Sequence, residues 1–144
     1  MELDSGTVVV SERGTGKFAQ EIRMGKHVIY ADEPLPNGDD TGPNPYDLLL
    51  GALGACTSMT LRLFADRRQM PLTRVSVTLH HDRVHRDDCD PSAGENCRIE
   101  RIERVITLEG DLTDEHRAAL LAVADRCPVH RTLHVEKEIV TTLA

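Results

Sequence analysis

The sequence predicts an α+β fold of a single domain, residues 1–144, in which antiparallel sheet wraps a long central apolar helix. Three observations lead to this prediction. Short segments rich in valine and isoleucine stand on both sides of one long helical segment, and turn residues separate them. The helical segment is apolar on nearly every face, so we expect it to lie in a core. The length also suits one domain. The expected element order is βββ-α-ββ-α-β.

Three short strands are expected to open the chain as a meander. Residues 7–11 are rich in valine and form the first strand. Gly14 and Gly16 supply a turn into a second strand over residues 17–23. A further glycine turn precedes the third strand, residues 27–31.

A loop rich in proline and glycine, residues 32–43, leads into the long helix. Asn44 is expected to act as the N-cap, Pro45 fits the first helical position, and Asp47 stands where a capping-box acid belongs. The helix is expected to run to about Arg68. Because it is apolar all round, it is expected to be buried, and a second copy of the chain could cover part of it.

The second half of the chain predicts two strands, a helix and a last strand. Residues 75–79 alternate as a strand, and residues 99–108 form a partner whose apolar residues slip out of strict alternation, which predicts a bulge. Thr113 is expected to cap a helix that ends near Arg126. Residues 135–142 are expected to close the chain as a strand.

Charge and hydropathy exclude several classes of protein. The chain has 17 Lys and Arg against 24 Asp and Glu, a net charge of -7, which argues against nucleic acid as a partner. The longest nearly apolar stretch, Leu48–Cys56, is too short to cross a bilayer, so no membrane association is expected. The N-terminus is acidic and shows no secretory signal. We therefore expect a cytoplasmic protein whose cysteines rest reduced.

Two cysteines stand in contrasting surroundings. Cys56 lies well inside the long helix, where a cysteine is commonly a small buried hydrophobe. A reactive role for Cys56 would require a nearby cation from elsewhere in the chain. Cys127 lies at a helix break before Pro128, close to Arg126 and His130 in sequence, and it could cap a new turn. Free backbone N–H groups and positive charge favour a thiolate there, although Cys127 could also simply end the helix.

The segment from Asn44-Pro45 to Ala55-Cys56, followed in the second half of the chain by Cys127-Pro128-Val129-His130, resembles the OsmC/Ohr family (osmotically induced protein C / organic hydroperoxide resistance). The turn Arg13-Gly14-Thr15-Gly16 is similar to an Arg-Gly-x-Gly turn of some members. The resemblance implies an intertwined homodimer with its active site at the dimer interface. It also implies an enzyme that reduces organic hydroperoxides with an external dithiol and without a cofactor or metal.

The resemblance assigns roles by position. Cys56 would be the peroxidatic cysteine, oxidised to a sulfenic acid, and Cys127 would resolve it as a disulfide. Arg13 would hold the Cys56 thiolate, with Arg23 as the alternative. The family's peroxidases carry Glu directly after the Asn-Pro pair, where this chain has Tyr46. Asp47 follows, and it could either reach the arginine or only cap the helix.

Other functions remain open on the same fold. A redox sensor or thiol buffer would use the same cysteines with negligible turnover. A binding module for a small apolar ligand would make them incidental. For a peroxidase, the apolar helix surface around Leu53 and Met59 would favour a hydrophobic peroxide. A hydrolase is disfavoured because the nucleophile-elbow motif is absent from the sequence.

A polar segment between the last two predicted sheet strands contains the other two cysteines. Their spacing is wider than that of the usual zinc knuckle, so the expected alternatives are a solvated loop, a reversible disulfide or a zinc site. The residues concerned are Cys89, Cys97, His80, His81 and His85.

Overall fold

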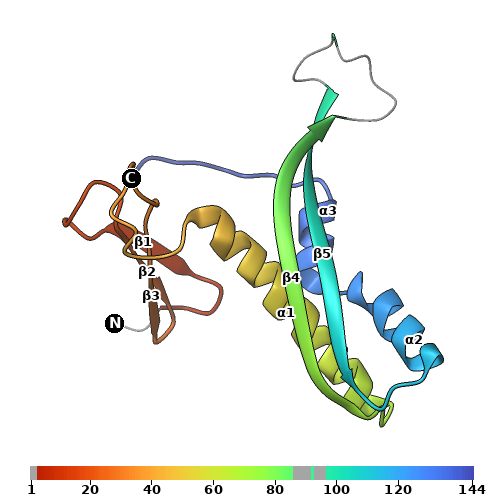
Figure 1. Ribbon diagram of the computed structural model, residues 1–144. Helices are drawn as coiled ribbons and strands as arrows, with labels where there is room; N and C mark the ends of the chain where they lie inside the picture. Colours follow the sequence, from red (N-terminus) through yellow and green to blue (C-terminus); the bar gives the residue numbers. More distant parts are fainter. Residues whose placement is uncertain (1–2, 86–91, 93–96) are drawn as a thin grey trace. The chain divides into compact units, whose positions relative to one another are not determined.

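A computed structural model describes residues 3–85, 92 and 97–144 of the chain. The chain forms two compact units, Met1–Leu49 and Leu50–Ala144, and each is described here by itself. The elements in chain order are β1 (Val8–Glu12), β2 (Gln20–Met24), β3 (His27–Ala31), α1 (Pro45–Arg67), β4 (Leu72–His85), β5 (Arg98–Gly110), α2 (Asp114–Ala124) and α3 (Pro128–His134) (Figure 1).

The first unit contains the predicted meander. Strands β1, β2 and β3 pair antiparallel in that order, which confirms the three expected strands. Gly14 and Gly16 both take positive φ, at 78° and 69°, and the Arg13 N–H donates to the Ala19 carbonyl, N to O 3.0 Å. These two glycines supply the turn because a side chain disfavours the left-handed region.

The loop between β3 and α1 is held by one buried carboxylate. Oδ2 of Asp32 accepts hydrogen bonds from the Thr41 hydroxyl at 2.7 Å and the Thr41 N–H at 3.1 Å, and Oδ1 accepts from the Glu33 N–H at 2.8 Å. The Thr41 hydroxyl bond is the main reason that the pKa of Asp32 lies below its ordinary value. Asp32 thereby closes the loop that leads to α1.

Helix α1 begins as the sequence predicts. The Asn44 side-chain oxygen accepts from the Asp47 N–H at 2.9 Å, and the Asp47 carboxylate accepts from the Asn44 N–H at 3.3 Å. These reciprocal bonds form a capping box ahead of Pro45. Asp47 therefore takes part in the cap, which is one of its two expected roles.

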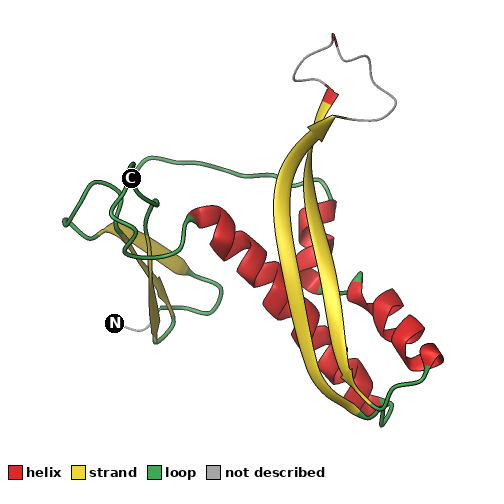
Figure 2. Cartoon of the chain, in the orientation of Figure 1, coloured by secondary structure: helices red, strands yellow, loops and turns green. Residues whose placement is uncertain are grey.

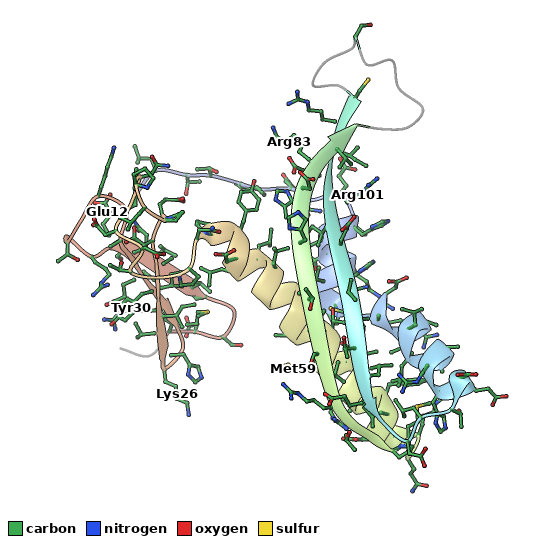
Figure 3. The ribbon with its side chains drawn as sticks, in the orientation of Figure 1. Glu12, Lys26, Tyr30, Met59, Arg83 and Arg101 are labelled. Carbon is green, nitrogen blue, oxygen red and sulfur yellow. The ribbon has the colours of Figure 1, made fainter. Side chains whose placement is uncertain are left out.

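The expectation that α1 is buried all round is wrong within one chain. One stripe is buried, and the opposite face is open: Met59 is 71% exposed and Leu63 is also exposed (Figure 3). By length and composition α1 could span a membrane, and no other helix in the described ranges could; a helix buried in a protein core passes the same test. The residues of the buried stripe are Leu53, Gly54, Thr57, Leu61 and Ala65.

A small residue lets α1 lie close to the sheet of the second unit. A Cβ atom at Gly54 would stand 2.8 Å from Cδ1 of Leu79 on β4. At Gly54 the close neighbour is a strand.

The long hairpin of β4 and β5 pairs without interruption from Arg74 with Glu109 to His85 with Arg98. The bulge expected within residues 99–108 is therefore wrong; the irregularity lies at the start of β4, between Leu72 and Arg74. The uneven spacing of apolar residues on β5 has another cause. Val105 belongs to the exposed face of the strand, so it does not continue the half-buried face.

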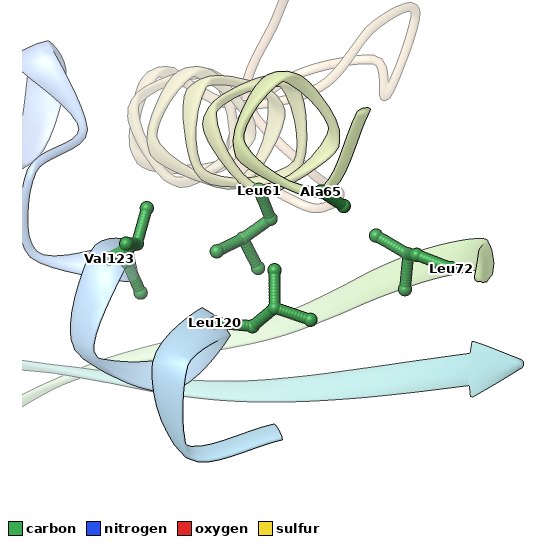
Figure 4. Packing of buried hydrophobic residues seen from close by; sticks show 6 residues of the cluster. Leu61, Ala65, Leu72, Leu120 and Val123 are labelled. Carbon is green, nitrogen blue, oxygen red and sulfur yellow. The ribbon is translucent and has the colours of Figure 1, made fainter. Parts of the chain in front are cut away.

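Side chains from α1, β4 and α2 meet in the core of the second unit. Leu61 on α1 and Leu120 on α2 are fully buried and point toward each other, with Leu72 of β4 beside them (Figure 4). Thr113 caps α2 as predicted: its hydroxyl accepts from the His116 N–H at 3.1 Å. The cluster consists of Leu61, Ala65, Leu72, Leu120, Val123 and Ala124.

The end of the chain differs in part from the prediction. Helix α2 ends at Ala124, and Cys127 caps the short helix α3, as the proline after it suggested. The strand expected over residues 135–142 is wrong, because this segment has no regular secondary structure (Figure 2). A strand needs a backbone partner, and no described strand pairs with this segment. Its apolar residues are exposed, Ile139 to 87%.

Candidate active site: a cysteine pair between two helices

The second unit brings Cys56 and Cys127 together. Cys56 lies in the middle of α1 and Cys127 at the N-cap of α3, and their side chains are hydrogen-bonded. Both are free thiols. Cys56 is half-buried, whereas Cys127 is 0% exposed. Of the two sulfurs, the one on α1 is thus the better placed to meet a reagent from outside.

The start of α3 directs backbone donors at the sulfurs. The His130 N–H donates to Sγ of Cys127, N to S 3.5 Å. Pro128 occupies the first helical position and has no N–H to donate. The Val129 N–H hydrogen-bonds to both cysteine side chains. The N-cap position of α3, with Pro128 next to it, therefore places backbone N–H donors around Cys127, and these donors stabilise a thiolate.

The two thiols differ in acidity. Burial raises the pKa of Cys56, and the hydrogen bond with Cys127 raises it further; the Val129 N–H and the Thr60 hydroxyl compensate only in part. Burial also acts to raise the pKa of Cys127. Its hydrogen bonds with Cys56, with the backbone of His130 and Val129 and with the Thr57 hydroxyl outweigh burial, so the pKa of Cys127 lies below its ordinary value.

Accessibility and acidity therefore favour different cysteines. The half-buried Cys56 can meet a substrate, while the buried Cys127 is the better acid. The two thiols interact, so their protons come off as those of a pair. A single proton held between the two sulfurs describes this pair better than two independent pKa values do. None of the groups that shift the pKa of Cys56 most is a cation. A thiolate on Cys56 thus still requires a positive charge.

The two arginines considered for that charge lie in the first unit. The Arg13 guanidinium stacks on the Tyr30 ring, 4.3 Å from its centroid. Nε of Arg23 pairs with the Glu21 carboxylate at 2.6 Å, which neutralises much of its charge. Arg13 is thus the arginine whose charge is the less compensated. Its pairing with Cys56 stays a prediction, as does any contact of Asp47 with it.

Sequence reasoning missed Arg104 and Thr57. Arg104 lies on β5 with its side chain only 12% exposed, and its Nη1 donates to the Thr57 hydroxyl at 3.0 Å. Its Nη2 pairs with Oδ1 of Asp125 at 3.0 Å. One signal could have found it: Arg104 occupies an inward position of the β5 alternation, between Ile102 and Ile106.

A cavity of about 800 Å³ lies beside this arrangement in the second unit. Its wall combines apolar side chains of α1, β5 and α2 with polar groups that adjoin Cys127, including Leu53, Ile106, Leu121, Asp125 and His130. Leu53 and Met59, which were expected to share one apolar surface, therefore belong to two different surfaces. Leu53 lines the cavity, whereas Met59 belongs to the open face of α1.

The other two cysteines belong to a separate part of the chain. Cys97 is disulfide-bonded, so the expectation that the cysteines rest reduced is wrong for Cys97. The bond favours the disulfide among the three alternatives and leaves the Cys97 sulfur unavailable to zinc. Cys89 and the side chain of His85 lie outside the described residues. Nε2 of His81 bonds to the Glu100 carboxylate at 2.6 Å. In the described ranges, no group of three or more His, Cys, Asp or Glu side chains could hold a metal ion.

Comparison with protein-family models gives one match. Residues 38–143 match the model of OsmC, described as OsmC-like protein. This segment includes Cys56, Cys127, Thr57 and Arg104. No curated protein sequence matches the chain.

Solved structures share the fold. An OsmC-like protein from Mycoplasma pneumoniae has a TM-score of 0.70 at 19% identity, covering 91% of this chain and 89% of the other. An organic hydroperoxide resistance protein OsmC from Legionella pneumophila has a TM-score of 0.62 at 19% identity, with 89% of both chains covered. The organic hydroperoxide resistance protein OhrB of Bacillus subtilis has a TM-score of 0.58 at 22% identity, covering 89% and 90%. At these identities the likeness shows a common fold.

Proposed function

Because the chain belongs to the OsmC-like protein family, we propose that it is a thiol-dependent peroxidase that reduces organic hydroperoxides. Two of the similar structures are named as organic hydroperoxide resistance proteins, from Legionella pneumophila and Bacillus subtilis. The family match covers both cysteines and their local motifs.

One observation carries the proposal. A half-buried thiol on α1 is hydrogen-bonded to a fully buried thiol at the α3 cap. A two-cysteine peroxidase needs one sulfur that a peroxide can reach and a second one at disulfide distance. Cys56 fits the first requirement and Cys127 the second. Chance burial of two separate cysteines would not require either their contact or the donors aimed at Cys127.

The chemistry follows from these positions. The Cys56 thiolate attacks the outer oxygen of the hydroperoxide, the O–O bond breaks, and the alkoxide leaves as an alcohol after taking up a proton. Cys56 is then a sulfenic acid. Cys127 attacks its sulfur, the S–S bond forms, and hydroxide leaves as water with the proton of the Cys127 thiol. An external dithiol returns both thiols by exchange and is itself oxidised to a disulfide. Arg13 supplies the positive charge for the Cys56 thiolate.

A homodimer is part of the proposal. The open face of α1 exposes Met59 and Leu63, and strands β1 and β3 expose further valines, isoleucine and tyrosine. Apolar surface of this extent on a single chain is typical of an interface. A second copy covering α1 would also exclude water from the surroundings of Cys56. A reducing, cytoplasmic setting would keep the pair ready for the next peroxide.

The cavity of the second unit supports a hydrophobic substrate. Its wall brings Leu53, Ile106 and Leu121 next to the polar groups that adjoin Cys127. Apolar surface binds the carbon part of an organic hydroperoxide and offers little to hydrogen peroxide.

A steady-state assay with a dithiol reductant tests the proposal. We expect turnover with cumene hydroperoxide to exceed turnover with hydrogen peroxide, and to vanish in Cys56→Ser. Cys97→Ser, which alters the separate disulfide, serves as the matched control and should retain turnover. Oxidation of Cys56 without turnover would instead indicate a redox sensor or thiol buffer. Two cysteines that remain unmodified by peroxide would indicate a binding module and contradict the proposal.

A further inference from the structure

Arg104 is a nearly buried arginine whose two terminal nitrogens both donate to protein groups. Its donors reach the Thr57 hydroxyl at 3.0 Å, the Ala124 carbonyl at 3.5 Å and the Asp125 carboxylate at 3.0 Å. A charged group with 12% exposure loses most of its hydration, so it needs such partners. For packing alone, an apolar residue at this position would do equally well. A cation at this position therefore calls for an explanation beyond packing.

The partners of Arg104 flank both cysteines. Thr57 follows Cys56 directly on α1. The Ala124 carbonyl that Arg104 contacts also accepts the backbone N–H of Cys127, N to O 3.3 Å. Arg104 thus ties the turn of α1 that carries one sulfur to the α2–α3 junction that carries the other.

Asp125 extends the same connection to the α3 cap. Its Oδ1 accepts from Arg104 and lies 3.9 Å from Nδ1 of His130. The backbone N–H of His130 is the donor to the Cys127 sulfur. The segment that holds Cys127 therefore has contacts on both sides: the Cys127 N–H donates to the Ala124 carbonyl, and His130 lies beside Asp125.

The Thr57 hydroxyl is the polar group shared between Arg104 and Cys127. It is fully buried, accepts from Nη1 of Arg104, and donates to the Leu53 carbonyl at 2.7 Å. It also hydrogen-bonds to the Cys127 side chain. Since Arg104 occupies a lone pair of this oxygen, the hydroxyl proton must point away from the arginine. It can then turn from the Leu53 carbonyl to the Cys127 sulfur when that sulfur is ionised.

We propose that Arg104 is a positioning residue for the second half of the reaction, holding Cys127, through Thr57 and Asp125, for attack on the Cys56 sulfenic acid. The inference rests on the proposed function. In the step concerned, the Cys127 thiolate forms the S–S bond and the S–O bond of Cys56 breaks. The departing hydroxide takes up a proton from solvent and leaves as water. Thr57 is fully buried and does not line the cavity, so we expect peroxide attack by Cys56 to proceed without its hydroxyl.

A single-turnover experiment separates the two steps. Reduced full-length protein is mixed with one equivalent of cumene hydroperoxide and quenched with a thiol-alkylating reagent at a series of times and pH values. Mass spectrometry then follows the Cys56 sulfenic acid and the Cys56–Cys127 disulfide. The variants are Arg104→Gln, Arg104→Lys, Thr57→Val and Thr57→Ser, and Arg98→Gln is the matched control because Arg98 is exposed on the same strand. Thermal unfolding checks that each variant folds.

In Thr57→Val we expect sulfenic acid to form at the wild-type rate. In both Thr57→Val and Arg104→Gln we expect the disulfide to form about tenfold more slowly or worse. In Thr57→Val, the pH at which disulfide formation reaches half its maximal rate should rise, because Cys127 has lost a donor to its thiolate. Thr57→Ser keeps the hydroxyl and should restore both the rate and the pH profile. Thr57→Val is close to isosteric, so it remains informative if the Arg104 variants unfold.

Disulfide formation at the wild-type rate and with the wild-type pH profile in both Thr57→Val and Arg104→Gln would overturn the inference, and so would an equal loss in Thr57→Ser. Slower sulfenic acid formation in these variants, with unchanged resolution, would also overturn it. Failure of the wild type to form any sulfenic acid would instead contradict the proposed function. The two failures are therefore distinguishable.

Discussion

The Cys56 thiol donates a hydrogen bond to the sulfur of Cys127, which links the middle of α1 to the N-cap of α3. This pairing raises the pKa of the donor and lowers that of the acceptor. It also keeps the two sulfurs in contact, and a disulfide between them would need such proximity. The contact therefore sets the relative acidity of the two thiols, and the proposed oxidation and resolution steps depend on it.

The titration of each cysteine is expected to depend on the other. In Cys56→Ala, Cys127 loses a donor, so its pKa should rise. In Cys127→Ala, Cys56 loses the contact that raises its pKa, so its pKa should fall. The pH dependence of alkylation, read residue by residue from peptide masses, measures both. Unchanged pH profiles in both variants would contradict the thiol–thiol hydrogen bond.

Replacing Arg13 is expected to slow peroxide attack. Arg13→Gln removes the proposed counter-charge of the Cys56 thiolate, so the rate of sulfenic acid formation should fall about tenfold or more near neutral pH. Arg23→Gln is the matched control, since Arg23 is already paired with Glu21. The rate is measured in the single-turnover experiment. A loss in Arg23→Gln without a loss in Arg13→Gln would transfer the role to Arg23.

A charge on the open face of α1 is expected to weaken the proposed dimer. Met59→Asp places a carboxylate where a second copy would bury the helix, and burying an unpaired charge is costly. Leu121→Asp introduces the same charge at an exposed leucine of α2 and serves as the control. Analytical ultracentrifugation should show a lower dimer fraction for Met59→Asp. A monomeric wild type would refute this prediction directly.

Acid is expected to destabilise the loop that Asp32 closes. The folded-state pKa of Asp32 lies below its unfolded value, so its contribution to stability is present above the unfolded pKa. That contribution is lost as the pH falls through the folded-state pKa. Urea unfolding at a series of acidic pH values should therefore show a weaker pH dependence in Asp32→Asn. Asp39→Asn, at an exposed position of the same loop, should follow the wild type.

Local signals predicted most of the fold. Asn44, Pro45 and Thr113 are capping residues whose effect depends only on neighbours in sequence, and both helices begin where they indicate. Cys127 before Pro128 likewise predicted a short helix with the cysteine as its cap.

The features that were predicted wrongly or not at all depend on partners that the sequence does not reveal. Residues 135–142 have the composition of a strand, yet a strand forms only where another backbone accepts and donates its hydrogen bonds. The apolar pattern of α1 predicted burial on every side, but pattern alone does not say which element covers Met59. No sequence motif singled out Arg104, and only the fold brings it to Thr57, which is far away in sequence.

The most direct test of the central claim is disulfide mapping after one equivalent of cumene hydroperoxide. Wild-type protein should yield a Cys56–Cys127 disulfide, and Cys127→Ser should stop at a sulfenic acid on Cys56 that a sulfenic-acid-specific nucleophile traps. A sulfenic acid on Cys127 in the Cys56→Ser variant, formed as fast as Cys56 reacts in Cys127→Ser, would reverse the two roles. Wild-type protein in which both thiols stay reduced would contradict the peroxidase assignment itself.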